Sequence, residues 1–180
     1  LGTRIETIPE AITPDSARER IQKLGELLNQ STLATGLIEK MEKDLKKAEA
    51  NRAAAQKQEL KALFLYARGS GLLLAAGEET GAATLFALAG LKNALNGFQG
   101  MKPASAEAIV LADPDVIVML KEAVHSLGGA EKARRLPGVA QTRAGKENRL
   151  IIMDDLLFSG FTHRLGEAVL ALQKAALTLP

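Results

Sequence analysis

The chain has 180 residues, 47% of them hydrophobic, which suits one domain or one large lobe of a bigger protein. Its 23 Lys and Arg nearly balance its 21 Asp and Glu, and no basic run is interleaved with aromatic residues, which argues against nucleic-acid binding. The absence of Cys excludes disulfides, thiolate zinc sites and iron–sulfur clusters held by this chain. No apolar stretch reaches the roughly 18 residues of a membrane-spanning helix.

The chain begins with Leu1-Gly2-Thr3, which is neither an initiator Met nor a signal peptide. We therefore expect it to be part of a longer protein, with any export signal outside this chain. Residues 3–8 alternate weakly and end at Pro9, a pattern that predicts a short strand or an extended segment.

Two helices are predicted next. Thr13 and Pro14 form a helix start, because Thr caps a helix well and Pro suits its first position. The buried stripe of this helix is predicted to comprise Ala17, Ile21, Leu24 and Leu28. A longer, charged and Ala-rich helix is predicted from Ser31 to Gln56, with Leu37, Met41 and Leu45 on its packed side. A coiled coil would need three or four heptads, which are not present.

Strands and helices alternate from residue 60 onward. The predicted strands are 63–67, 72–76, 115–119 and 150–153, the first two paired as a hairpin. The predicted helices are 80–89, 106–112, 130–136 and 162–177. The last of these should bury Leu165, Val169, Leu172 and Ala176. This alternation predicts an α/β fold of three layers, with a mostly parallel central sheet, preceded by a long helix.

Ligands of such sheets bind outside the carboxyl ends of the strands. Three segments follow predicted strands and should form loops there: 68–71, 121–129 and 154–163. The sequence therefore predicts a ligand site where these three loops meet.

Motifs of catalysis are missing. There is no P-loop, no nucleophile elbow and no H-E-x-x-H, and Gly69-Ser70-Gly71 lacks the third glycine of a dinucleotide fingerprint because Leu74 stands there. No nucleophile with a base and no acid–base pair is assembled, so we predict that the protein is not an enzyme.

Asp154-Asp155 follows a predicted strand, where it could hold a divalent metal or cap the next helix; we favour the cap. The only histidines, His125 and His163, both fall in predicted strand-end loops, where each is either solvated or a metal ligand.

Two further residues lie at the end of the first predicted strand. Tyr66 is the only tyrosine, and we favour a packed core position for it over a metal-ligand role. Arg68 is either simply exposed or an anion clamp.

Several runs resemble the haem-binding periplasmic proteins of bacterial haem ABC importers, the HmuT-like family. They are FLYARGSG at 64–71, LAAGEETGA at 74–82, LAG at 88–90, MKPASAE at 101–107, ADPDVIV at 112–118, SLGG at 126–129, LPGVAQT at 136–142 and MDDLL at 153–157. Residues 103–118 are shared with the wider class that binds siderophores and cobalamin. The runs at 136–142 and 153–157 resemble the haem binders more narrowly.

The resemblance implies two α/β lobes joined by one long helix, with the ligand between the lobes. Residues 1–58 would be an extended segment, a short helix and the linker helix, and residues 59–180 the second lobe. The first lobe, which usually carries the axial tyrosine of the haem iron, would be absent, and Tyr66 does not match that tyrosine. The implied role is to capture haem in the periplasm and deliver it to an ABC permease, without spanning the membrane itself.

The resemblance also implies which residues touch the ligand. Arg68, Gly69, Lys121 and His125 become candidates for contact with the haem propionates or iron. Arg164 joins them, although Thr162-His163-Arg164 stands where the family tends to have Gly-Pro-Arg. The metal ligand is left open among Tyr66, His125 and His163.

Glu107 is a candidate for docking onto the permease. Proteins of this class present one glutamate per lobe to arginines of the transporter, and Ser105-Ala106-Glu107 resembles the second-lobe segment that carries it. The alternative is an ordinary acid in the first turn of a helix.

Other functions remain as alternatives. A siderophore or cobalamin binder belongs to the same class, whereas a ligand-free α/β interaction domain does not. A subunit of a metallo-oxidoreductase is a further alternative, against which the lack of Cys argues.

Overall fold

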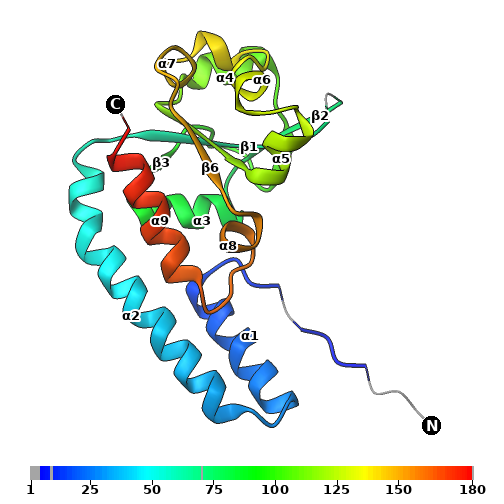
Figure 1. The fold of residues 1–180 in the computed structure, drawn as a ribbon, viewed down its shortest axis with the longest axis vertical. Coiled ribbons are helices and arrows are strands. Elements are labelled where there is room, and N and C mark those ends of the chain that lie inside the picture. Colours follow the sequence, from blue (N-terminus) through cyan, green and yellow to red (C-terminus); the bar gives the residue numbers. More distant parts are fainter. Residues whose placement is uncertain (1–4, 9, 70, 180) are drawn as a thin grey trace.

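The computed structural model describes residues 5–8, 10–69 and 71–179 and shows a long helical pair leading into an α/β lobe (Figure 1). Residues 5–8 are extended but form no strand. The strand alternative for residues 3–8 is therefore wrong where the chain is described, and residues 3, 4 and 9 lie outside the described part.

Helices α1 (Pro14–Leu27) and α2 (Ser31–Gln56) begin and end close to the predicted positions. α1 starts with a capping box: Ser16 N donates to Thr13 Oγ1 at 3.1 Å, and Thr13 N donates to Ser16 Oγ at 3.0 Å. Met41 of α2 is fully buried. Figure 1 shows α2 running from the tip of the helical pair to the edge of the sheet.

The predicted buried stripe of α1 is wrong in its second half, because Leu24 is 39% and Leu28 67% exposed. The contact face runs instead through Ala17, Ile21 and Gly25. A Cβ added to Gly25 would lie 2.4 Å from the Cβ of Ala34 on α2. This close approach puts Gly25, and not Leu24, at the contact between the two helices.

The sheet has the strand order β4-β2-β1-β5-β6, with a short strand β3 (Lys92–Asn93) beside the start of β1. The strands are β1 (Lys61–Arg68), β2 (Leu72–Ala76), β4 (Met101–Pro103), β5 (Val116–Leu120) and β6 (Leu150–Met153). β1, β5 and β6 are parallel, whereas β2 is antiparallel to both β1 and β4. The mostly parallel sheet and the β1–β2 hairpin are confirmed; β3 and β4 are too short to show a periodic pattern and were not predicted.

Helices cover both faces, which confirms the three layers. Figure 1 shows α3 (Gly81–Ala89), α8 (Asp155–Ser159) and α9 (Leu165–Leu177) on one side of the sheet. On the other side lie α4 (Ala106–Ala112), α6 (Ala130–Arg134) and α7 (Arg143–Lys146), with a short 3-10 helix at Val139–Gln141. Local signals set the limits of these helices: Thr80 and Ser105 are the N-caps of α3 and α4, and Gly90 ends α3 with a φ of 81°.

A buried carboxylate links the start of β5 to its neighbours. Asp115 accepts a hydrogen bond from the backbone amide of Lys61, in β1, at 2.8 Å. It also forms an ion pair with Arg143 of α7, whose Nη1 lies 2.5 Å from Asp115 Oδ1. The Arg143 guanidinium also binds Asp113, through Nε at 2.9 Å. These contacts anchor the outer layer to the centre of the sheet.

Candidate ligand-binding site

The three predicted strand-end segments do lie together. Gly69 N, after β1, donates to Ser126 Oγ, after β5, at 3.1 Å. Glu122 N donates to Asp155 Oδ2, after β6, at 3.1 Å. The carboxyl ends of the three parallel strands therefore form one continuous edge, as predicted.

Two of these segments are helical, so the prediction that both are loops is wrong. Residues 121–126 form α5 (Lys121–Ser126), which buries Ala123 and Val124. The segment 154–163 contains α8, whose N-cap is Asp154: Leu157 N donates to Asp154 Oδ1 at 2.9 Å. Asp154 and Asp155 both serve backbone amides, which confirms the capping interpretation.

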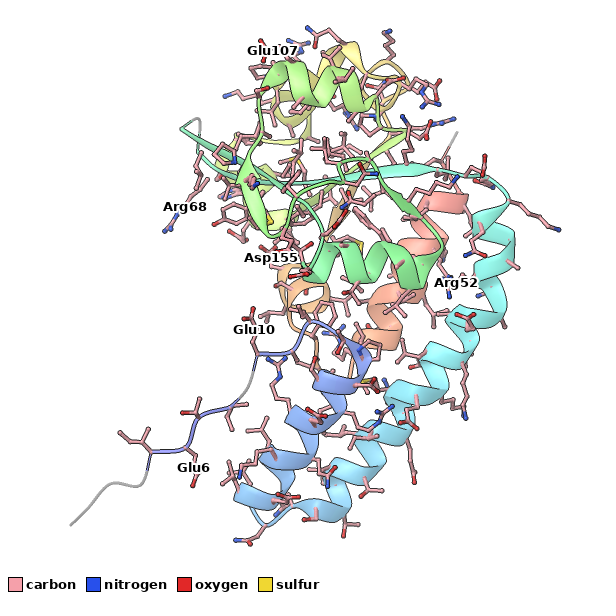
Figure 2. The ribbon with its side chains drawn as sticks, turned by 180° about the vertical axis from the view of Figure 1, so that it is seen from behind. Glu6, Glu10, Arg52, Arg68, Glu107 and Asp155 are labelled. Atoms are coloured by element: carbon pink, nitrogen blue, oxygen red, sulfur yellow. The ribbon has the colours of Figure 1, made fainter. Side chains whose placement is uncertain are left out.

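Arg68 lies at the exposed end of β1 and projects outward (Figure 2). Within residues 5–8, 10–69 and 71–179, no hydrogen bond or ion pair engages its guanidinium. Lys121 and His125 are also exposed, and Tyr66, on the same strand face as Arg68, is half-buried. The edge thus presents two basic side chains, Arg68 and Lys121, beside the carboxylates of Glu122, Asp154 and Asp155, of which Asp154 and Asp155 accept hydrogen bonds from backbone amides.

His163 and Arg164, the two candidates that precede α9, lie away from the edge around Arg68 or are already paired. Arg164 is held by Glu167 through two parallel bonds, Nε–Oε2 at 2.9 Å and Nη2–Oε1 at 2.7 Å. The same hydrogen bonds lower the pKa of Glu167. His163 lies in a separate hollow of about 220 Å³ beside Leu24, Leu28 and Leu33, between α1 and α2. The structure therefore does not bring His163 together with His125.

Among the described residues, no group of three or more His, Asp or Glu side chains could hold a metal ion. A metal bound through the protein alone is thus not supported, whereas an iron already held in a porphyrin needs only one or two protein ligands.

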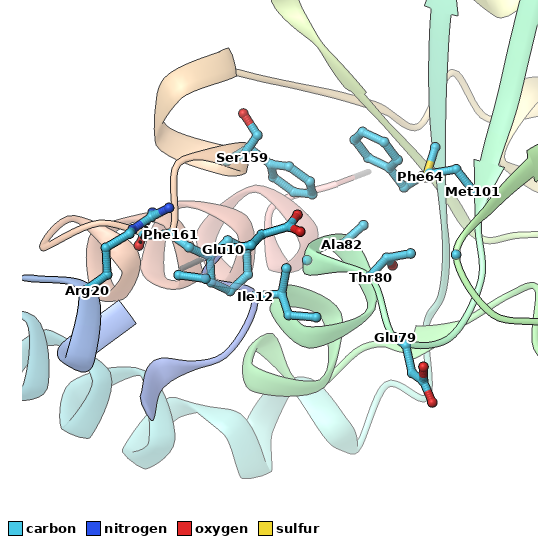
Figure 3. Close-up of a pocket in the computed structure, with 14 residues that line it drawn as sticks. Glu10, Ile12, Arg20, Phe64, Glu79, Thr80, Ala82, Met101, Ser159 and Phe161 are labelled. Carbon is cyan, nitrogen blue, oxygen red and sulfur yellow. Dashed lines mark hydrogen bonds between the residues drawn. The ribbon is translucent and has the colours of Figure 1, made fainter. Parts of the chain in front are cut away.

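A cavity of about 440 Å³ lies between the sheet, the start of α3, the end of α8 and the segment before α1 (Figure 3). The rings of Phe64 and Phe158, which both line it, stack with centroids 5.1 Å apart. The lining residues are Glu10, Ala11, Ile12, Arg20, Phe64, Glu79, Thr80, Gly81, Ala82, Gly100, Met101, Phe158, Ser159 and Phe161.

None of the site residues predicted from the sequence lines this cavity. The lining comes from segments far apart in the chain, so no local pattern could have revealed it. Three of the runs that resemble the haem binders contain lining residues: 64–71 contains Phe64, 74–82 contains Glu79 to Ala82, and 101–107 contains Met101.

Glu107 is exposed at the start of α4, and it forms no ion pair within the described part of the chain (Figure 2). Its own backbone amide and the Ser105 side chain lower the pKa of its carboxyl. Beside it, a shallow hollow of about 560 Å³ is lined by Val110, Leu111 and Gly138. Leu111 is 88% exposed.

An α/β lobe that is led by a long helix, with a strand-end edge and a partly apolar cavity, has the architecture of a solute-binding protein. The chain belongs to the family described as periplasmic binding protein, which matches residues 3–157. Among curated protein sequences, none matches this chain.

Three solved structures show the likeness in detail. The periplasmic heme-binding protein RhuT from Roseiflexus sp. RS-1 is 31% identical with a TM-score of 0.82, over 92% of this chain and 65% of RhuT. The periplasmic heme-binding protein BhuT, solved with two hemes, is 29% identical with a TM-score of 0.86, over 95% of this chain and 65% of BhuT. The heme-binding protein HmuT is 26% identical with a TM-score of 0.82, over 93% of this chain and 56% of HmuT.

This chain therefore spans less than two thirds of the length of these relatives. The family and these relatives are binding proteins rather than enzymes. No helix in the described part of this chain is long and apolar enough to cross a membrane.

Proposed function

We propose that this chain is the linker helix and second lobe of a two-lobed periplasmic protein that captures haem and passes it to an ABC permease. The observation that carries the proposal is the exposed guanidinium of Arg68 at the strand-end edge, which has no partner among the described residues, in a fold shared with three haem-binding proteins. Haem carries two propionates, and a guanidinium binds a carboxylate through two parallel hydrogen bonds.

The proposed division of the chain follows the secondary structure. Residues 1–58 contain α1 and α2, which ends at Gln56, and residues 59–180 contain every strand of the sheet, starting with β1 at Lys61. A first lobe preceding this chain would close the ligand between two surfaces. Further contacts with the ligand are proposed for four residues of the second-lobe surface: Gly69, Lys121, His125 and Arg164. Arg164 can contribute only if a propionate replaces Glu167 as the partner of its guanidinium.

Tyr66 is the proposed iron ligand from this lobe, in preference to His125 and His163. Among the matched structures are HmuT variants in which a tyrosine, or an arginine two positions further on, is replaced by alanine. Tyr66 is the only tyrosine of this chain, and Arg68 follows it at the same spacing. Tyrosine is a known haem ligand, and Tyr66 lies on the strand face that bears Arg68.

Titration of the full-length protein with haemin tests the proposal. A sharp Soret shift that saturates at a fixed ratio is expected, and Tyr66→Phe should change the visible charge-transfer bands while the protein still folds. Cobalamin and ferric hydroxamates are the comparison ligands. If cobalamin or a ferric hydroxamate binds and haemin does not, that compound is the ligand in place of haem. If none of the three compounds binds, the chain is better described as an interaction domain.

A further inference from the structure

Arg20 of α1 reaches across to the turn between α8 and α9. Its Nη2 donates to the carbonyl oxygens of Gly160 and of Phe161, the second at 2.8 Å. The side chain is half-buried and lines the 440 Å³ cavity (Figure 3). Two carbonyl groups from one turn therefore fix the position of this guanidinium.

The two carbonyls orient the charge of Arg20 but do not neutralise it. Within the described residues, no carboxylate forms an ion pair with Arg20, and its Nε and Nη1 have no hydrogen-bond partner. Glu79, the acid at the α3 side of the cavity, is bound by Gln99 Nε2 at 2.7 Å. Glu10 lines the cavity too, and its carboxylate points away from Arg20 in Figure 3.

Arg18, on the same helix, shows the usual situation of a surface arginine. It pairs with Asp15 at 2.6 Å and with Glu42 at 2.8 Å, and neither contact faces the cavity. Arg18 is thus paired with carboxylates, whereas Arg20, at the cavity wall, has no carboxylate partner among the described residues.

We infer that Arg20 is a carboxylate-binding residue that orients the ligand in the cavity. The inference rests on the proposed function, because haem is the ligand that would bring a carboxylate. Near apolar groups such as Phe161 and Ile12, a charge interaction is stronger than in water. Because Arg20 is already held in place, binding a propionate costs little side-chain entropy. The rest of the porphyrin would then lie against the apolar lining.

The test compares haem with haem dimethyl ester, whose propionates carry no charge. Both are titrated into the full-length protein, its Arg20→Gln variant and the matched control Arg18→Gln. Arg20→Gln should weaken haem binding on the order of 10- to 100-fold, the effect of losing a hydrogen bond to a charged group. The same variant should bind the ester as tightly as the wild type does. Arg18→Gln should change neither affinity.

Equal loss of affinity for haem and ester would overturn the inference, because it would make Arg20 only a support of the α8–α9 turn. Unchanged haem affinity would overturn it as well. If Arg20→Gln fails to fold, Arg20→Lys keeps the charge without the fixed fork, and a selective loss of haem over ester would still be expected. A wild-type protein that binds neither compound would instead overturn the proposed function, which separates the two failures.

Discussion

The buried side chain of Gln173 on α9 donates from Nε2 to the carbonyl oxygen of Ala48 on α2, at 2.8 Å. The same Nε2 lies 3.4 Å from the carbonyl oxygen of Ala89, the last residue of α3. One amide thus joins the three helices that meet beneath the sheet. Its Oε1 is buried with no partner among the described residues.

Substitution of Gln173 should separate the effect of packing from that of hydrogen bonding. Gln173→Met keeps the volume, loses a hydrogen bond worth about 1 kcal/mol and removes a buried unpaired oxygen of similar cost, so stability should change by less than about 1 kcal/mol. Gln173→Ala leaves a cavity and should lower the free energy of unfolding by roughly 2–3 kcal/mol. Urea unfolding measures both, and equal losses in the two variants would contradict this account.

Gly166 brings α9 against α2, and a side chain there should be destabilising. A Cβ at this position would lie 2.8 Å from both Leu45 N and Met41 O. Gly166→Ala should therefore cost about 1–3 kcal/mol of stability through overpacking. Gly36, an exposed residue of α2 with no atom within 4 Å of an added Cβ, is the control. Gly36→Ala should stabilise by about 0.5–1 kcal/mol through helix propensity, and thermal melts of the two variants should shift in opposite directions.

The ion pairs around Arg143 should make the fold sensitive to acid. The backbone amide and guanidinium of Arg143 lower the pKa of Asp113 below its ordinary value of 3.8. A lowered pKa contributes stability that is complete above the unfolded value and is lost as pH falls through the folded one. The free energy of unfolding should therefore stay level from pH 7 to about 5 and fall below about 4.

Arg143→Met tests the source of this dependence. It leaves the buried carboxylate of Asp115 without its ion partner, which should cost about 1–3 kcal/mol at pH 7. It should reduce the loss in acid only in part, because the backbone amide of residue 143, the largest cause of the lowered pKa of Asp113, remains. Lys92→Met, which removes the exposed pair with Glu59, is the control: it should leave stability at pH 7 nearly unchanged and alter the acid profile only slightly, through the pKa of the exposed Glu59. A parallel acid profile in wild type and Arg143→Met would assign the dependence to the backbone amide of residue 143 or to other carboxylates, and not to the guanidinium.

Arg68→Ala should weaken haem binding by about 1.5–3 kcal/mol if Arg68 holds a propionate. Arg68→Lys should restore only part of this, because an ammonium cannot make the two parallel bonds of a guanidinium. Soret titrations of the three proteins give the affinities. Equal affinity in wild type and Arg68→Ala would remove Arg68 from the site.

Glu107→Arg should separate haem binding from delivery. Glu107 is exposed and forms no ion pair within the described part of the chain, so reversing its charge should leave the fold and haem affinity unchanged. Docking by charge complementarity would fail, and the transporter's haem uptake and stimulated ATP hydrolysis should drop. Glu39→Arg is the control, because Glu39 is an exposed acid of α2 that forms no ion pair among the described residues. Normal uptake with Glu107→Arg would reduce the residue to a helix-start acid.

The sequence by itself determined the elements whose signals lie within a few neighbouring residues. The cap at Thr13 with Pro14, the limits of α2, the cap at Thr80 and the stop at Gly90 are local, because capping and periodicity involve residues one or two turns apart. The apolar runs of β1, β5 and β6 identified the parallel strands, and the general rule for such sheets located the edge around Arg68.

Only the tertiary structure determined what depends on distances between remote segments. The contact of Gly25 with Ala34 exposes Leu24, and burial of Ala123 and Val124 turns a predicted loop into α5. The cavity and the contact of Arg20 with the α8–α9 turn join segments some 140 positions apart. No periodic pattern records such a pairing, because close packing selects it after the helices and strands have formed.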